Sequence, residues 1–356
     1  MNKAHLRSEL LALLQLSALR VSENEFEAIL RALPTSFNWS YFLERAIATN
    51  LAGYLLHYPK LAEKYYPTQV YQKIKAYQQR ILLHSTLLRE AILDLVPKFN
   101  EQHIEFALLK GWDLHFRYGI SLKQRQISDI DILIHEKDLD QLERLLQQNG
   151  YQTSRYNYKS RFHQKWLPTH APLSAQKAGM MLDVHTKAIA KVHRITIPLQ
   201  LDKKQKIELA DGAQIWVLNE AEAQLFSAFH AIKHLEALHD FKASQIRELN
   251  IDSCHYEQLG EKEKDLLQKL TSFLMRLKTF QLNQNESYDA FYVQQLTGGK
   301  IPLQIKARQI LQRLKFKTSF GKSIVLGYFD LFPSKAYLQQ RFGQGNYWLL
   351  NLKRFQ

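Results

Sequence analysis

The carboxylates of Asp129 and Asp131 stand two residues apart in the stretch ISDIDILIH. Its alternation of apolar and polar residues predicts a half-buried β-strand, with Ile130, Ile132 and Ile134 on one face and the two acids on the other. Two residues of strand rise span only about 6.6 Å, so the anions repel each other unless water or a cation screens them. Taken alone, the pair is better explained by a solvated strand face than by a metal site, so other parts of the chain have to decide.

Other residues point to a polar site near the pair. Lys110 and Gly111 follow a short apolar stretch, and a glycine at a strand-to-helix turn lets backbone N–H groups approach a phosphate. Arg125, four residues before Asp129, is a natural bidentate partner for phosphate. Asp183 interrupts the apolar strand MMLDVHT, where an ionised carboxylate is costly unless it faces a polar site. Three such carboxylates would suit Mg²⁺ or Mn²⁺. A site that holds two of these ions can activate an attacking oxygen and stabilise a leaving pyrophosphate.

Three histidines form a second candidate group. His230 and His234 are four residues apart and therefore share one helix face, while His185 lies on the same strand face as Asp183. This spacing could bind zinc, but the chain has no HExxH glutamate beside these histidines, and Cys254 is its single cysteine. A polar helix face that lines a nucleotide pocket and plain surface histidines both remain open.

Periodicity divides the chain into four parts. Helical spacing dominates its beginning, as in ENEFEAILRAL and YQKIKAYQQRILLHSTLLREAILDLV, and Pro34, Pro59 and Pro67 interrupt it where helices should end. Strand-like and helical stretches then alternate, and helical character returns after Asn219. We expect a helical N-terminal region (1–100), a core (101–218), a helical domain (219–299) and a basic C-terminal segment (300–356).

The core is expected to mix strands with helices. HIEFALLKG and QIWVL are typical of short buried strands, and YQTSRYNYK and GMMLDVHT indicate two more strands around a polar, proline-containing connection. WDLHFRYG and EKDLDQLERLLQQNGY have the spacing of helices, and Asn219 and Glu222 have the capping-box spacing that opens another. The predicted fold class is therefore α/β (α+β), with a mixed sheet between helical regions.

The order of four motifs carries a resemblance to a known family. LLKGWDLHFRYG, RQISDIDILI, LDVHT and VLNEAEAQLFSAFHAIKH resemble the bacterial family of uncharacterised nucleotidyltransferases, within the polymerase beta-like nucleotidyltransferase superfamily, over about residues 85–255. The resemblance implies that Asp129 and Asp131 are metal ligands. It also implies that Asp183 is a third carboxylate that helps to deprotonate the acceptor, and that Gly111 is the glycine of the phosphate turn.

The implied activity is metal-dependent transfer of a nucleoside monophosphate from a nucleoside triphosphate to an acceptor hydroxyl, with release of pyrophosphate. Trp112 departs from the family pattern, because many nucleotidyltransferases have serine or a second glycine there, and Lys110 or Arg125 could hold the triphosphate instead. The expected catalytic and metal residues are Asp129, Asp131 and Asp183, and the expected nucleotide-binding residues are Lys110, Gly111, Arg125, His185, His230 and His234.

Composition narrows the class of protein. The chain has 356 residues, 46% of them hydrophobic, which is enough to bury a sizeable core. No apolar run approaches the roughly 18 residues of a membrane span, and Glu9 interrupts the apolar N-terminus, which we interpret as an amphipathic helix and not as a signal peptide. A single cysteine excludes an internal disulfide framework and fits a reducing, cytoplasmic location.

The net charge of +14 indicates a polyanionic partner. Residues 300–356 hold eleven Lys or Arg and one acid, Asp330. This segment is expected to guide an RNA acceptor, which we favour over an anionic membrane surface, although a solvated basic surface is also compatible with it. The stretch YQTSRYNYKSRFHQKW could stack on a base or pack its rings on the core.

Two rival interpretations remain open. A catalytically silent relative would use the same pocket to bind a nucleotide or RNA, and it could lose one carboxylate without unfolding. Convergence of all three carboxylates within about 5 Å would therefore favour an enzyme. Metal-dependent phosphoester hydrolysis uses similar carboxylates, and pyrophosphate release in the presence of an acceptor separates it from transfer.

Overall fold

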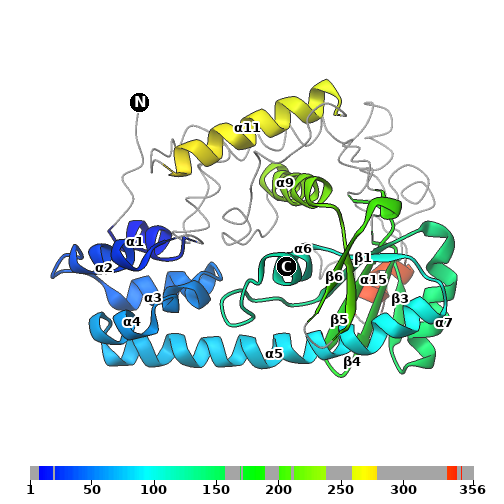
Figure 1. The fold of residues 1–356 in the computed structure, drawn as a ribbon, viewed down its shortest axis with the longest axis horizontal. Coiled ribbons are helices and arrows are strands. Elements are labelled where there is room, and N and C mark those ends of the chain that lie inside the picture. The colour runs from blue at the N-terminus through cyan, green and yellow to red at the C-terminus, as the bar shows by residue number, and fades with distance from the viewer. Residues whose placement is uncertain are drawn as a thin grey trace.

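The computed structural model describes a mixed α/β protein, and it confirms the predicted fold class. Its sheet has seven strands and lies at one end of the molecule, with a group of short helices at the other end (Figure 1). A long helix runs beneath both parts (Figure 1). The described residues are 8–18, 21–156, 169, 171–188, 200–209, 212–237, 259–278, 335–342 and 346.

The N-terminal region is helical, as its periodicity predicts. Its helices are α1 (Ser8–Leu16), α2 (Glu23–Arg31), α3 (Trp39–Ala48), the 3-10 helix η1 (Ala52–Leu56), α4 (Pro59–Tyr65) and α5 (Thr68–Glu101). Pro59 is the first residue of α4, and Pro67 caps the beginning of α5. These prolines lie where one helix has ended, as expected, since η1 ends at Leu56 and α4 at Tyr65. They also mark the beginning of the next helix, where the missing N–H would have no partner.

Helix α5 contributes to two hydrophobic cores. Its first half buries Val70 and Ile81 in the core of the N-terminal helices, and its second half buries Leu88 and Phe99 against the sheet. The change from one core to the other therefore falls inside a continuous helix, between Ile81 and Leu88. The domain boundary at residue 100 stays a prediction.

The sheet has the order β3-β4-β5-β2-β1-β7-β6. Strand β2 pairs in parallel with β5 and antiparallel with β1. The sequence did not predict β4 or β6, because LSAQK and QKIE are too polar to be recognised as strands. The strands are β1 (Phe106–Leu108), β2 (Ile130–Ile134), β3 (Gln152–Arg155), β4 (Leu173–Lys177), β5 (Met180–His185), β6 (Gln205–Glu208) and β7 (Gln214–Val217).

The central strand β2 is buried on both faces. Ile130, Ile132 and Ile134 pack in the core below the sheet with the second half of α5, as the alternation predicts. Leu133 and Asp131, on the other face, are buried as well, so the expectation of a half-buried strand was wrong. The reason is tertiary: helices cover both faces of the sheet, and Asp131 lies in an enclosed polar site instead of in water.

Further helices complete the layers. They are α6 (Lys110–Tyr118), η2 (Glu136–Asp138), α7 (Leu139–Gln148), η4 (Leu201–Lys203), α9 (Glu220–Ala237), α11 (Glu261–Lys278) and α15 (Lys335–Phe342). Asn219 caps α9 by accepting a 3.1 Å bond from the Glu222 N–H. Half of the predicted capping box is thus present, while the Glu222 carboxylate accepts from the N–H of Gln200, at 3.2 Å. Helix α9 covers the sheet, and α11 lies above it (Figure 1).

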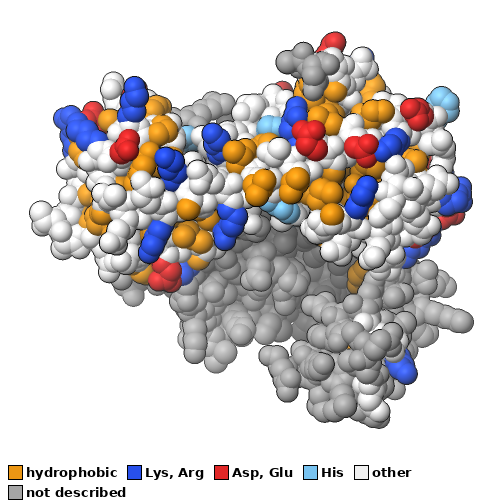
Figure 2. Space-filling view, turned by 90° about the horizontal axis from the view of Figure 1, so that it is seen from below, with side chains coloured by type: hydrophobic (Ala, Val, Ile, Leu, Met, Phe, Trp, Pro, Cys, Tyr) orange, Lys and Arg blue, Asp and Glu red, His pale blue; other side chains and the backbone are white. Residues whose placement is uncertain are grey.

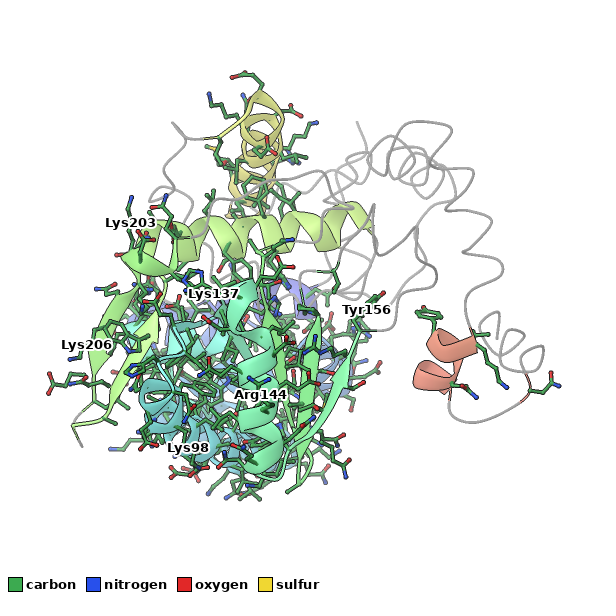
Figure 3. All side chains as sticks on the ribbon, turned by 90° about the vertical axis from the view of Figure 1, so that its right-hand side faces the viewer. Lys98, Lys137, Arg144, Tyr156, Lys203 and Lys206 are labelled. Carbon is green, nitrogen blue, oxygen red and sulfur yellow. The ribbon has the colours of Figure 1, made fainter. Side chains whose placement is uncertain are left out.

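The two ends of the aromatic stretch differ. Tyr151 is buried in the core against the sheet. Tyr156, at the end of the edge strand β3, is exposed on the same side of the molecule as Arg144 of α7 (Figure 3). Residues 157–168, which hold the other aromatic side chains of this stretch, lie outside the described residues.

The basic C-terminal segment is described only at α15 and Asn346, so its expected helix and its charged face lie outside the described residues. On the described underside of the molecule, basic side chains are scattered among apolar ones (Figure 2). None of the helices in the described part of the chain combines the length and the apolar composition of a membrane span.

Candidate active site

Three carboxylates meet where β2 and β5 lie side by side. Asp131 of β2 is the register partner of Asp183 of β5, and parallel pairing turns both side chains to the same face. Asp129 lies just before β2 begins. An oxygen of each carboxylate lies within 4.8 Å of the others, which meets the condition of convergence that the sequence suggested. Among the described residues, this is the group that could hold a metal ion.

Asp131 is the buried member of the group, with 4% of its side chain exposed. The Lys110 ammonium donates to its Oδ1 at 2.6 Å, and the Nε2 of His185 lies 2.8 Å from the same oxygen. A carboxylate only accepts, so Nε2 carries the proton of this bond. Burial would raise the pKa of Asp131, but the nearby Lys110 and His185 outweigh burial and hold this pKa below its usual range.

Asp183 has the opposite shift. Burial raises the pKa of its carboxyl to about 6, the charges of Asp131 and Asp129 add to this effect, and Lys110 opposes it. A carboxyl with a pKa near neutrality is well matched to accept a proton at physiological pH. Two neighbouring acids on paired strands thus differ in proton affinity because of their surroundings.

An unusual backbone brings Lys110 to this group. Its φ of 54° lies in the left-handed region, which favours glycine and costs about 1 kcal/mol or more in another residue. The N–H of Leu109, just before it, donates to the carbonyl of Asp131 at 3.0 Å and fixes the turn against β2. Burial would lower the pKa of Lys110, but attraction to Asp131 and the other carboxylates raises it overall, so the ammonium stays charged.

Two residues that hold Asp129 were missed from the sequence. Trp112 is fully buried, and its indole N–H donates to the carbonyl oxygen of Asp129 at 2.9 Å. The hydroxyl of Ser128 donates to Oδ1 of Asp129 at 3.1 Å. Trp112, noted from the sequence only as a departure at the expected phosphate turn, is therefore a core residue that positions the first carboxylate.

Arg125 lies over Gly111. A methyl group on Gly111 would overlap the guanidinium of Arg125 and would lie 3.1 Å from its Cζ. Glycine thus lets the guanidinium of Arg125 approach this closely, and a side chain at residue 111 would push the flexible end of Arg125 aside, whereas the sequence suggested the approach of a phosphate. Gly111 and Arg125, both predicted to bind phosphate, are therefore neighbours in space. Their role in binding phosphate stays a prediction.

The three histidines separate in the structure. His185 is buried and contacts Asp131. Its ring lies edge-on to Phe226 of α9, with ring centroids 6.5 Å apart, and Phe226 in turn lies 6.0 Å from the half-buried His230. His234 follows one turn later in α9, and its side chain lies outside the described residues. The face of α9 that was predicted from His230 and His234 thus approaches the carboxylate group through the ring of Phe226.

A second buried ion pair lies on α6. Arg117 donates to Asp113 at 2.6 Å and also to the carbonyl oxygen of Leu218 and, at 2.7 Å, to the side chain of Gln205. Burial raises the pKa of Asp113 to about 6 even though Arg117 lowers it. This pair joins α6 to the segment around β6 and β7, and the sequence did not single it out.

The fold and the carboxylate group define a class of protein. The chain belongs to the family described as uncharacterised nucleotidyltransferase, whose model matches residues 35–250, more than half of the chain. The resemblance noted from the motifs is thereby confirmed. No curated protein matches the chain.

Two solved structures are similar to parts of the chain. One is the solution structure of the antibiotic-resistance factor ANT(2'')-Ia, 14% identical, with a TM-score of 0.35, covering 55% of this chain and 97% of that one. The other is the crystal structure of ANT(2'')-Ia in complex with adenylyl-2''-tobramycin, 14% identical, with a TM-score of 0.34, covering 53% of this chain and 97% of that one. Similarity at this level leaves the acceptor of this protein open.

Proposed function

We propose that the protein transfers a nucleoside monophosphate from a nucleoside triphosphate to an acceptor hydroxyl and releases pyrophosphate. The observation that carries this proposal is the convergence of Asp129, Asp131 and Asp183 within 4.8 Å in a chain of the nucleotidyltransferase family. A silent relative can lose one of these acids, and this chain retains all three. The silent nucleotide- or RNA-binding protein is therefore the weaker alternative.

The three carboxylates fit a magnesium or manganese site. Carboxylate oxygens are the ligands that Mg²⁺ takes from proteins, together with water and substrate phosphates. Three acids this close repel one another, and Lys110 balances only part of their charge. A divalent ion held by these residues would polarise the α-phosphate and stabilise the leaving pyrophosphate.

The transfer itself exchanges one phosphorus–oxygen bond for another. The acceptor oxygen forms a bond to the α-phosphorus, and the bond from that phosphorus to the bridging oxygen of the pyrophosphate breaks. The hydroxyl proton passes to a carboxylate oxygen of Asp183, which lies within 4.8 Å of the other two acids, and the electron pair of the broken bond leaves with pyrophosphate. Asp131 stays ionised throughout, since Lys110 and His185 hold its pKa low.

Lys110 and Arg125 are the proposed phosphate contacts. Both are cations at the edge of the carboxylate group. Lys110 donates to Asp131, and Arg125 lies against Gly111, the residue that follows Lys110 in the chain. Charge-assisted hydrogen bonds from such groups suit a triphosphate. His185 orients Asp131, and His230 is proposed to line the nucleotide pocket beside Phe226.

The acceptor is proposed to be RNA, guided by the basic segment 300–356. A protein side chain or a small molecule would use the same chemistry. The activity test is incubation with labelled nucleoside triphosphates, Mg²⁺ or Mn²⁺ and total cell extract. Labelled RNA together with pyrophosphate is the expected result, labelled protein or small molecule would change the acceptor, and nucleotide hydrolysis without any labelled product would contradict transfer.

The basic segment has its own test. Purified protein is titrated with mixed tRNA and with anionic vesicles across a salt series. RNA binding should weaken steeply with salt and should largely vanish when the Lys and Arg residues of 300–356 are neutralised, because phosphate contacts release counterions. Vesicle binding without RNA binding would contradict the RNA proposal.

A further inference from the structure

The loop between α6 and β2 is held from outside the sheet. It carries Arg125 and ends at Asp129, so its position sets both a proposed phosphate contact and a proposed metal ligand. Its own backbone makes a turn, with the N–H groups of Gln124 and Arg125 donating to the carbonyl of Ser121 at 2.9 and 3.3 Å. Helix α6 holds the two ends of the loop, through Trp112 at the carbonyl of Asp129 and His115 at the carbonyl of Ile120, and the N-terminal helices support the stretch between them.

Gly53 of η1 is the closest point of this support. A methyl group on Gly53 would lie 2.8 Å from the carbonyl carbon of Gln124 and 2.8 Å from the carbonyl oxygen of Lys123, and it would overlap the carbonyl oxygen of Gln124. All three atoms belong to the backbone, so a rotamer change cannot relieve the overlap. Any side chain at residue 53 must therefore displace the loop or η1.

Side chains of α5 and of His57, which follows η1, reinforce this contact. Gln78 donates to the carbonyl of Gly53 at 2.7 Å, which fixes η1 on α5. Tyr77 donates to the side chain of Gln126 at 3.1 Å, and the side-chain amide of Gln124 lies 3.1 Å from the Nδ1 of His57.

The same bonds connect to the site. Gln124 and Gln126, which the helices hold, flank Arg125, and the guanidinium of Arg125 lies against Gly111. Farther along α5, the Nε2 of His84 lies 3.4 Å from the carbonyl of Ser128, whose hydroxyl donates to Asp129. The contacts therefore follow the loop from Lys123 to Ser128.

We infer that the N-terminal helices act as a clamp that sets the position of Arg125 for the nucleotide, and that Gly53 and Tyr77 are positioning residues of this site. The inference rests on the proposed function for its ligand, but the clamp itself is a property of the described contacts. It assigns to the N-terminal helices a part in nucleotide binding, although none of their residues belongs to the carboxylate group.

The first experiment is a double-mutant cycle on nucleotide binding. Kd for a non-hydrolysable triphosphate with Mg²⁺ is measured for the full-length protein and for Gly53→Ala, Arg125→Ala and the double variant. We expect Gly53→Ala to weaken binding about tenfold, and the double variant to bind no more weakly than Arg125→Ala alone, because coupled residues are not additive. Additive losses would overturn the inference. Tyr77→Phe, which keeps the ring and removes only the hydroxyl, should weaken binding less than Gly53→Ala does.

A matched control separates positioning from stability. Phe42 is fully buried among Phe37, Trp39 and Tyr66 in the N-terminal core, so Phe42→Leu destabilises the same helices without contacting the loop. Phe42→Leu should bind nucleotide like the wild type wherever it is folded. Equal weakening by Phe42→Leu and Gly53→Ala would show general destabilisation and overturn the clamp.

Hydrogen exchange tests the clamp without any nucleotide. Amides of residues 121–128 should exchange faster in Gly53→Ala than in the wild type, and at the wild-type rate in Phe42→Leu. Unchanged exchange in Gly53→Ala would overturn the inference even if nucleotide binds. Faster exchange in a protein that binds no nucleotide would leave the clamp standing and would contradict the proposed function instead.

Discussion

Two buried acid–base pairs lie at the two ends of α6, and they differ in what surrounds them. Asp131 pairs with Lys110 at the first residue of the helix, and Asp113 pairs with Arg117 one turn apart within it, both at 2.6 Å. Around Asp131 stand two more carboxylates. Around Arg117 stand two further acceptors, the carbonyl of Leu218 and the side chain of Gln205.

The difference separates the carboxylate that we propose as a metal ligand from one that joins parts of the fold. The guanidinium of Arg117 donates hydrogen bonds to three partners in separate parts of the chain, so its ion pair with Asp113 joins parts of the fold. The ammonium of Lys110 faces three acids and cannot neutralise them all, so this group retains negative charge that a cation can offset. Burial and ion pairing are common to both pairs. The charge of Glu220 also raises the pKa of Asp113, but among the described residues three carboxylates within 4.8 Å of one another are found only around Asp131.

The strongest test of this comparison is Asp131→Asn. Transfer should fall roughly a thousandfold, because one ligand and its charge are lost from the site where charge develops. The far-ultraviolet circular dichroism spectrum should stay unchanged. The matched variant Asp113→Asn should keep its rate per folded molecule. Normal turnover by Asp131→Asn would remove the metal assignment.

The structural pair is tested by Arg117→Ala. Removing one partner of a buried pair leaves the other charge uncompensated, so the free energy of unfolding should fall by about 3–5 kcal/mol. Urea denaturation measures this change, with the exposed variant Arg31→Ala as a control that should change little. A loss below 1 kcal/mol would show that Asp113 and Arg117 do not join the fold as described.

The phosphate contacts are expected to have a smaller effect. Lys110→Ala and Arg125→Ala should each weaken nucleotide binding by about 1.5–3 kcal/mol, the range for hydrogen bonds to charged groups. Isothermal titration with a triphosphate and Mg²⁺ measures the change. Unchanged affinity in both variants would move the phosphate site elsewhere.

The pH dependence of stability concerns Asp183. Its folded-state pKa of about 6 lies above its unfolded value, so the native state binds more protons between pH 4 and 6 and loses stability as pH rises through that window. With a metal chelator present, the free energy of unfolding of Asp183→Asn should therefore rise relative to that of the wild type as pH increases from 4 to 7. The rise should reach up to about 2 kcal/mol, at roughly 1.4 kcal/mol per pKa unit. Parallel stability curves would refute the raised pKa.

The same shift responds to metal. A divalent ion favours the ionised form of Asp183, so Mg²⁺ should restore wild-type stability at pH 7 and should leave Asp183→Asn almost unchanged. Thermal unfolding at pH 7 with and without Mg²⁺ measures this difference. Equal stabilisation of both proteins would place the ion elsewhere.

Local patterns predicted much of the architecture. The alternation in β2 correctly placed its three isoleucines on one face, and the glycine stop after EKDLDQLERLLQQNGY matches the end of α7, where Gly150 has a φ of 80°. They failed for β4 and β6, whose polar residues lack a strand pattern and whose pairing depends on neighbours distant in the chain. They also failed for the exposure of Asp131, because helices far away in the sequence cover that face.

The sequence by itself determined which residues could do chemistry here: an acid pair at period two, a third acid in an apolar strand, and a Lys-Gly turn with an arginine near them. These are properties of residue type and short spacing, so they survive without coordinates. Only the tertiary structure decided how they meet, because register between β2 and β5 sets Asp131 beside Asp183, and the backbone of Lys110 aims its ammonium at them. The contact of Gly53 with the backbone of Gln124 is likewise tertiary, since 71 residues separate them in the chain.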